Sequence, residues 1–538
     1  MRAVNGGNGG AGVSGQLGPL KLPHVEYHFL LPFLILVGSA LALLALASLI
    51  RGKWRPGMYA GWTIVTGLVA IGWSWHLWGQ VVGHHHPGKP GAVAAVSGAI
   101  AVDGFGLLMT MTICVAVILG ALLAESYLPR EHLEGPEFYV LTMLSASGGI
   151  LMAQANDLIV VFLGLEILSL SLYVLTAFHR RRAESGEAGI KYFVLGAFSS
   201  AFFLYGVALV YGATGTTSLP AIADFLSKNV LTSNGVLLAG AAFLLVGLGF
   251  KVAAVPFHVW TPDVYQGSPT PATGFMAAAA KTAGFAALLR IFLSALPTQA
   301  DNWRPLVFGL AVTTLLVGSI LAVVQTDVKR ILAYSSISHA GYVLLGLYAA
   351  TASGGVSTNG LAGASVYLMS YTFMIAGSFA VVTFVGAKGD ERHSLENYRG
   401  LSADRPALAL AFTILLISQA GIPFTTGFIA KFDVISAVVA HGGAPDYVLG
   451  VLAMLAAVIS TYFYLRIILA MYSSTDDSTE PAAEGQGGGT ATLTATARRA
   501  KVPVSISLAV IISVGVTVAF GIVPSPMIHL AEKATLLF

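Results

Sequence analysis

About fourteen apolar segments recur along this chain, and this feature most constrains what it can fold into. A hydrocarbon core about 30 Å thick is crossed by about 20 helical residues, so each segment can span a bilayer. The segments do not alternate between apolar and polar residues, as lipid-exposed strands would. Charged residues make up 10% of the chain, whereas a soluble domain carries about 25%. We therefore expect an all-α polytopic membrane protein with about 14 transmembrane helices.

Several cofactor and partner classes are excluded by the composition. A single cysteine, Cys114, excludes a disulfide within the chain, a four-thiolate zinc site and an iron–sulfur cluster. Gly7, Gly9 and Gly12 match a dinucleotide-binding pattern, but no strand precedes them and no helix follows. The triplet at 84–86 is three histidines in one short loop, which supplies no fixed metal geometry. The net charge of +3 is too small to indicate nucleic acid as a partner. We expect no cofactor or metal held by this chain.

The distribution of basic residues predicts the topology. Arg51, Lys53 and Arg55 follow the first apolar segment, whereas a cleaved signal peptide carries its positive charge before the apolar run. Most of the Lys and Arg residues between segments fall in loops after odd-numbered segments, which the positive-inside rule places in the cytoplasm. We therefore expect both termini on the outer side of the membrane.

Four ionisable residues lie inside apolar segments: Glu166, Lys251, Lys281 and Lys431. A charge at the bilayer centre costs about 2.5–3.5 kcal/mol on insertion scales, so it indicates function by default. Three lysines and one glutamate cannot all pair, and burial in general lowers the pKa of a lysine because it disfavours the charged form. A lysine that can take up and release a proton is a proton carrier, so we expect these four residues to translocate protons.

Two further residues, Lys191 and His339, are expected to support this relay. Lys191 opens the sixth segment, and His339 lies in the tenth beside the hydroxyl-rich stretch 334–338. A histidine changes its charge near neutral pH and can pass protons. Arg290 and Arg466, in contrast, lie near segment ends, where a long side chain can reach the membrane surface.

Two apolar segments are interrupted beside two of the lysines. Pro256 follows Lys251, and Gly421 and Pro423 precede Lys431. Proline removes a helical hydrogen bond, and irregular backbone survives in a membrane only against protein or a water-filled cavity. The interrupted segments are the seventh and the twelfth, and such a pair in corresponding positions indicates an inverted-repeat transporter. We expect two inverted five-helix repeats, helices 4–8 and 9–13, with helices 7 and 12 broken.

These features divide the chain into predicted parts. The parts are a flexible N-terminal tail (1–28), transmembrane helices 1–3 (29–133), the first repeat (134–300), the second repeat (301–474), a disordered cytoplasmic linker (475–502), and transmembrane helix 14 with the C-terminus (503–538).

The stretches around the charged residues also resemble a known family. They are Gly164–Glu166, Gly249–Pro271, Lys329–Tyr342, Tyr398–Leu401 and Ala420–Phe432. Over roughly residues 130–470 the chain resembles the antiporter-like membrane subunits of respiratory complex I (NADH-quinone oxidoreductase). Lys431 in its Gly-Ile-Pro context favours the N-type subunit over the M-type, which has glutamate there, and no long lateral helix follows the bundle as in the L-type.

The resemblance implies a role for each charged residue. Glu166 and Lys251 would form a pair, Lys281 would be the central relay, and Lys431 would be the terminal proton site. It also implies a non-redox, proton-translocating subunit of a bacterial plasma (inner) membrane, which works with other membrane and peripheral subunits, including neighbouring antiporter-like subunits. FMN, iron–sulfur clusters and quinone would then lie in partner subunits.

Other functions remain compatible with the residues. A subunit of a multi-subunit cation/proton antiporter or of a membrane-bound hydrogenase would use the same fold. Sodium binding needs several oxygen ligands, which the lysine-rich sites disfavour. A scaffold whose charges only hold helices together is a third reading. It predicts that Lys251→Met destabilises the protein without a specific loss of proton transport.

Overall fold

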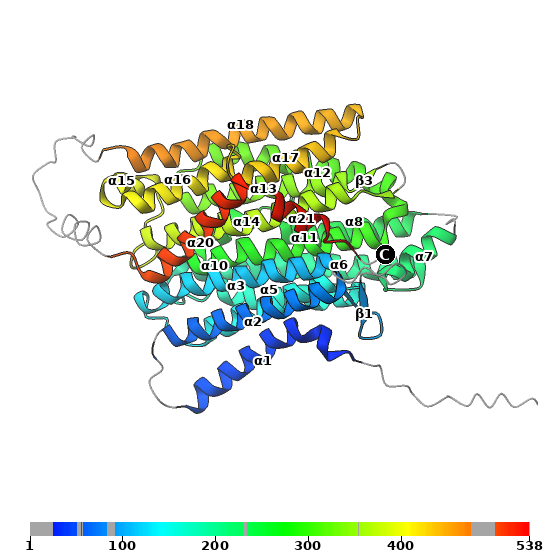
Figure 1. Ribbon diagram of the computed structural model, residues 1–538, viewed down its shortest axis with the longest axis horizontal. Helices are drawn as coiled ribbons and strands as arrows, with labels where there is room; N and C mark the ends of the chain where they lie inside the picture. Colours follow the sequence, from blue (N-terminus) through cyan, green and yellow to red (C-terminus); the bar gives the residue numbers. More distant parts are fainter. Residues whose placement is uncertain are drawn as a thin grey trace, which may run out of the picture.

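The computed structural model describes residues 25–50, 55, 57–82, 92–229, 234–352, 355–474 and 501–536. Most of the predicted N-terminal tail and of the predicted linker lies outside the described residues. Figure 1 shows the helices side by side with their axes roughly horizontal, from α1 at the lower edge of the view to α18 at the upper edge. The described part is an all-helical bundle apart from two short β-hairpins, which confirms the all-α membrane fold.

Eleven helices of the described part are long and apolar enough to cross a membrane. They are α1 (Tyr27–Leu49), α3 (Gly104–Arg130), α5 (Leu158–Thr176), α6 (Ala183–Thr214), α8 (Gly235–Val252), the span Thr270–Ala295, α12 (Ala300–Val323, with the preceding turn from Pro297), α13 (Val328–Ala349), α14 (Thr358–Val385), α18 (Ala444–Tyr472) and α20 (Val504–Ile522).

The remaining elements are shorter or less apolar. They are α2 (Gly57–Val81), α4 (Glu137–Gln154), α7 (Leu219–Lys228), α9 (Thr261–Gly267), α15 (Leu401–Asp404), α16 (Pro406–Ala420), α17 (Thr426–Val439), α21 (Ser525–Glu532), and the hairpins β1–β2 (Val93–Ala95, Ile100–Val102) and β3–β4 (Thr351–Ala352, Gly355–Val356). The predicted spans near residues 69, 146 and 420 correspond to α2, α4 and the α16–α17 pair, so the count of 14 is not confirmed.

The span Thr270–Ala295 lies at the centre of the bundle. It consists of α10 (Thr270–Phe275), a π-helical turn (Met276–Ala280), α11 (Lys281–Arg290) and a second π-helical turn (Ile291–Ala295). Its whole length is buried, and α13 is nearly as buried, whereas fewer than half of the residues in the most apolar stretches of α1, α6 and α18 are buried. The central helices therefore carry the residues that the protein shields from lipid.

Both predicted helix breaks are present. Helix α8 ends at Val252, Ala253 has a φ of 62°, and α9 starts at Thr261. Helix α16 ends before Gly421, whose φ is +89°, and α17 starts at Thr426. The prolines and glycines in these connections explain the interruptions, because they remove helical hydrogen bonds or permit a left-handed backbone.

A matched backbone pattern precedes α5 and α13. Asp157 caps α5 and forms an isolated antiparallel bridge with Ser218. Asp327 caps α13 and forms the same kind of bridge with Ser394. The bridging hydrogen bonds are also equivalent, since the N–H groups of Leu158 and Val328 donate to the residues just before Ser218 and Ser394. The two helices therefore begin in the same local structure.

Candidate functional site

Lys251 lies at the end of α8, directly before the first break. Its ammonium group donates hydrogen bonds to the hydroxyls of Ser169 (2.9 Å) and Tyr192 (3.1 Å). Glu166 is one turn before Ser169 on α5, and its Oε1 is buried without a hydrogen-bond partner. The direct pair expected between Glu166 and Lys251 is therefore not formed. Hydroxyl groups take the place of the carboxylate around the ammonium group.

Lys281 begins α11, immediately after the π-helical turn. Its Nζ donates to the Ser336 hydroxyl (2.5 Å) and to the main-chain carbonyl of Ser336 on α13. The Tyr371 ring of α14 lies 5.5 Å from the same atom. A Cβ built on Gly284, one turn after Lys281, would lie 3.4 Å from Lys251 Cγ. Helix α11 therefore packs against Lys251 at Gly284 and contacts Ser336 of α13 through Lys281.

His339 occupies the middle of a row of hydroxyl groups. Its Nδ1 is 2.6 Å from the Tyr367 hydroxyl, and its Nε2 is 3.1 Å from the Tyr464 hydroxyl. Tyr464 is in turn hydrogen-bonded to Ser335, the neighbour of Ser336. A neutral imidazole has one donor and one acceptor nitrogen, so one tyrosine donates to it and the other accepts. This arrangement has the connectivity that a proton relay needs.

Lys431 closes the row at the second break. Its Nζ donates to the carbonyls of Gln419 (2.9 Å) and Ala420 (2.8 Å), the last residues of α16. It also lies 4.8 Å from the centre of the Tyr342 ring, which stacks on Tyr367. The free carbonyls at a helix C-terminus attract a positive charge. The hydrogen-bonded part of the row runs from Ser335 through Tyr464 and His339 to Tyr367. Lys281 adjoins one end through Ser336, and Lys431 adjoins the other through the Tyr342 ring.

The sequence analysis noted the hydroxyl-rich stretch 334–338 but missed the other hydroxyl groups that contact Lys251 and His339. Ser169, Tyr192, Tyr367 and Tyr464 are buried side chains whose hydroxyls contact Lys251 or His339. The available signal was a hydroxyl group within an apolar segment, but hydroxyls are common in membrane helices because they bond to neighbouring helices. Their functional placement depends on packing between segments far apart in the chain.

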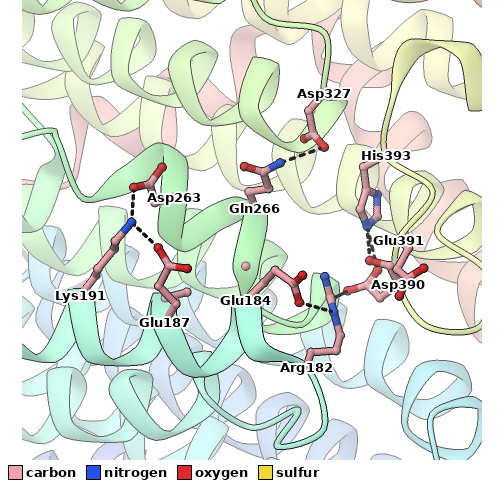
Figure 2. A pocket seen from close by; sticks show the side chains of 12 residues that line it. Arg182, Glu184, Glu187, Lys191, Asp263, Gln266, Asp327, Asp390, Glu391 and His393 are labelled. Carbon is pink, nitrogen blue, oxygen red and sulfur yellow. Dashed lines mark hydrogen bonds and ion pairs between the residues drawn. The ribbon is translucent and has the colours of Figure 1, made fainter.

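Lys191 lies apart from this row, in a surface cavity of about 320 Å³ (Figure 2). Its ammonium group pairs with Glu187 (2.7 Å) and Asp263 (2.9 Å), and 42% of its side chain is exposed. Asp263 also pairs with Arg330 at 2.8 Å. The predicted supporting residue therefore does not contact Lys251, although its neighbour Tyr192 does.

The expectation that Arg290 reaches the membrane surface is wrong. Arg290 is fully buried and forms two hydrogen bonds of 2.8 Å with the Asp103 carboxylate and one of 2.8 Å with the carbonyl of Ala153. Asp103, the cap of α3, brings its carboxylate into the bundle, and a buried arginine needs such a partner. Arg466 instead donates to the carbonyl of Val323, at the end of α12.

No cluster of three or more His, Cys, Asp or Glu side chains suited to a metal ion occurs in the part of the chain that the structure describes. The histidine triplet at 84–86, which the sequence analysis set aside as a metal site, lies outside that part.

Comparisons with known proteins agree with this arrangement. The family described as NADH:quinone oxidoreductase/Mrp antiporter, transmembrane, matches residues 155–463. The chain is 42% identical over 450 residues to NADH-quinone oxidoreductase subunit N of Trichlorobacter lovleyi, covering 83% of this chain and 88% of the relative. A chain of respiratory complex I from Thermus thermophilus matches with a TM-score of 0.72 and 31% identity, covering 94% of this chain and all of that one. A chain of the Mrp complex from a Dietzia species shares the fold, with a TM-score of 0.77, 20% identity, and 95% and 97% coverage.

Proposed function

Because the chain belongs to the NADH-quinone oxidoreductase subunit N family, we propose that it carries protons in that enzyme along its buried row of lysines, hydroxyls and His339. The observation that carries the proposal is the row from Lys281 through Ser336, Tyr464 and His339 to the Lys431 side. Polar groups are costly in an apolar interior unless they are hydrogen-bonded. Hydroxyl groups alone could serve adhesion between helices, but buried lysines among them, each with neutral oxygen partners, favour transport.

Each charged residue then has a distinct part in the transfer. Lys251 receives a proton while Glu166 is near, because a nearby carboxylate favours the ammonium form. When the two separate, Lys251 passes the proton towards Lys281, the central relay. The hydroxyls and His339 carry it on to Lys431, the terminal site. One pKa unit corresponds to about 1.4 kcal/mol, so a small change in geometry is sufficient to direct the proton.

The proposed topology follows from the sequence and from the matched starts of α5 and α13. We propose 14 transmembrane helices with two inverted five-helix repeats, covering 134–300 and 301–474, after three helices in 29–133. The equivalent bridges Asp157–Ser218 and Asp327–Ser394 support the repeats. Basic loop residues support both termini on the outer side of a bacterial plasma membrane.

The chain is proposed to act only within its complex. It would dock against other membrane subunits, including neighbouring antiporter-like ones, while FMN, iron–sulfur clusters and quinone belong to partner subunits. The free energy for pumping then comes from quinone reduction in those partners. In this chain, the energy would act by changing the distance between Glu166 and Lys251.

The first test is copurification followed by replacement of the relay lysines. The chain is tagged, extracted from its native membranes in mild detergent, and assayed for NADH:quinone reductase activity with flavin and iron–sulfur signals. In membrane vesicles, Lys281→Met and Lys431→Met are expected to lower NADH-driven proton uptake by at least about tenfold. The amount of assembled complex on native gels should stay normal.

A matched control is Lys228→Met. Lys228 is an exposed lysine at the end of α7 that pairs with Asp224, so its loss should leave proton uptake unchanged. Wild-type uptake in Lys281→Met vesicles would contradict the proposal. Copurification with hydrogenase activity, or cation/proton exchange without NADH oxidation, would assign the row to a different machine.

A further inference from the structure

The connection between α9 and α10 is held from both sides by two charged residues of the second half of the chain. Thr270, the first residue of α10, donates from its backbone N–H to Asp390 Oδ2 (3.1 Å) and from its hydroxyl to Oδ1 (2.6 Å). Lys329 donates to the carbonyl of Ser268, the residue that ends α9, at 2.7 Å. The Lys329 ammonium group and Asp390 Oδ2 are 3.7 Å apart. We refer to Asp390, Lys329 and Thr270 as the clamp.

Asp390 is fully buried on the loop between α14 and α15, and several elements supply its partners. Arg182, before α6, lies 3.2 Å from Oδ2, and Tyr127 of α3 donates to the same oxygen at 3.2 Å. His393 of its own loop lies 3.1 Å from Oδ1. Figure 2 shows Arg182 and His393 on either side of Asp390 at the edge of the surface cavity. A buried carboxylate with this many partners has a fixed position.

The clamp joins the starts of the two helices that form the Lys281 contact. Helix α10 begins at Thr270 and continues through the π-helical turn to Lys281, eleven residues later or about 16 Å of helix. Helix α13 begins at Val328, next to Lys329, and carries Ser336 two turns later. An acidic group at a helix N-terminus stabilises it, because it accepts from free N–H groups. The position of each helix start therefore determines where Lys281 and Ser336 meet.

We propose that Asp390 is a positioning residue, which with Lys329 aligns the starts of α10 and α13 and so sets the contact between Lys281 and Ser336. This inference rests on the proposed function, in which a proton passes through that contact. The clamp lies outside the row of proton carriers and acts on it through the helix backbone.

The alternative is that Asp390 has a purely structural role, for which any negative charge at this position is sufficient. The Asp390→Glu variant distinguishes this structural role from the proposed positioning role. Glutamate keeps the charge but is one methylene longer in a fully buried site, so it displaces the start of α10. A 1 Å misplacement can cost about 100-fold in rate. We expect Asp390→Glu complexes to assemble at normal levels but to transport fewer protons per NADH oxidised, by about tenfold. A wild-type ratio would overturn the proposal.

Thr270 provides a second, milder test should Asp390 variants fail to assemble. Thr270→Val keeps the shape of the side chain and removes the hydroxyl that donates to Asp390, whereas Thr270→Ser keeps that hydroxyl. We expect the proton-to-NADH ratio to fall severalfold in Thr270→Val and to be restored in Thr270→Ser. Equal ratios in both variants would overturn the proposal.

A matched control is Glu131→Gln. Glu131 is a buried carboxylate that accepts from the N–H of Gly389, next to Asp390, and its hydrogen-bond and ion-pair partners are Arg130, Gly389 and His179 rather than residues of α10. Its replacement should leave the proton-to-NADH ratio of the assembled complex unchanged. A fall equal to that of Asp390→Glu would show a general effect of the loop and would also overturn the proposal.

Lys281→Met, measured in parallel, separates this inference from the proposed function. If Lys281→Met transports protons normally, the proposed function is wrong, and the clamp inference with it. If Lys281→Met loses transport while Asp390→Glu and Thr270→Val retain it, only the clamp inference is wrong. Adding Thr270→Val to Lys281→Met should cause no further loss, because both changes act on the same step.

Discussion

Lys251, Lys281 and Lys431 are bound by neutral oxygen atoms rather than by carboxylates. Lys251 and Lys281 contact the hydroxyls of Tyr192 and Ser336, whereas Lys431 contacts only main-chain carbonyls among its hydrogen-bond partners. A hydroxyl can accept from an ammonium group or donate to a neutral amine, but a carbonyl can only accept. Lys251 and Lys281 therefore each have a hydroxyl partner that suits both protonation states, as a relay requires, whereas the two carbonyl partners of Lys431 cannot donate to a neutral amine.

Tyr464→Phe tests the hydroxyl row at the level of one atom. Phenylalanine keeps the ring but removes the oxygen that joins His339 to Ser335. We expect a loss of about 1 kcal/mol in stability from the broken hydrogen bonds. Proton uptake per NADH should fall severalfold in vesicles with normal amounts of complex. Tyr462→Phe is the control, because Tyr462 lies on the same helix and exposes 57% of its surface; equal effects of the two variants would refute the role of Tyr464.

The sequence was sufficient to identify residues whose charge is energetically costly inside an apolar segment, whatever their partners. A charge in an apolar run is visible without knowledge of its partners, which is why Lys251, Lys281 and Lys431 could be identified. Arg290 has the same signal, but its partner Asp103 is 187 residues away, and the fold alone decides that they meet. The role of Tyr464 likewise depends on the approach of α18 to α13.

At the scale of elements, Gly421 is required at the second break for two independent reasons. Its φ of +89° strains any residue with a Cβ, and a Cβ there would lie 2.8 Å from Lys431 Cδ. Both the backbone conformation at the break and the position of the Lys431 side chain therefore require that residue 421 has no Cβ. The sequence predicted this break from its glycine and proline residues, because their backbone effects are local. It could not predict that the end of α16 would supply the carbonyl partners of Lys431.

Gly421→Ala should consequently harm both stability and transport. We expect a loss of about 1–3 kcal/mol from backbone strain, together with displacement of Lys431 from the carbonyls of Gln419 and Ala420. The measurements are the thermal midpoint of the purified complex and proton uptake in vesicles. Gly515→Ala in α20 is the control, since a Cβ there meets no atom within 4 Å. A normal midpoint and normal uptake in Gly421→Ala would show that the break tolerates a side chain.

At the scale of the whole molecule, the clamp predicts how stability depends on pH. Burial alone would raise the pKa of Asp390, but the charge of Lys329 and hydrogen bonds from His393 and Thr270 lower it below its usual 3.8. Arg182 and Tyr127 also face this carboxylate. Because the pKa is lower in the folded state, the ionised form stabilises the fold above about pH 4, and this contribution is lost as the pH falls further.

The check is the thermal midpoint of the complex from about pH 6 to pH 3, for the wild type and for Asp390→Asn. Asparagine does not ionise, so the difference between the two midpoints should be largest at pH 6 and shrink towards pH 3. A difference that stays constant over this range would show that the ionisation of Asp390 does not contribute to stability.

The helix that carries Lys281 is held by charged hydrogen bonds near both of its ends. Asp390 binds its first residue, Thr270, and Asp103 binds Arg290 twenty residues later. A helix restrained in this way resists sliding along its axis, because sliding would separate two buried carboxylates from their partners. Between the two restraints lies the π-helical turn Met276–Ala280, directly before Lys281. We therefore expect any backbone motion between the two restraints to occur in this wider turn, where it would shift Lys281 while the rest of the helix stays in place.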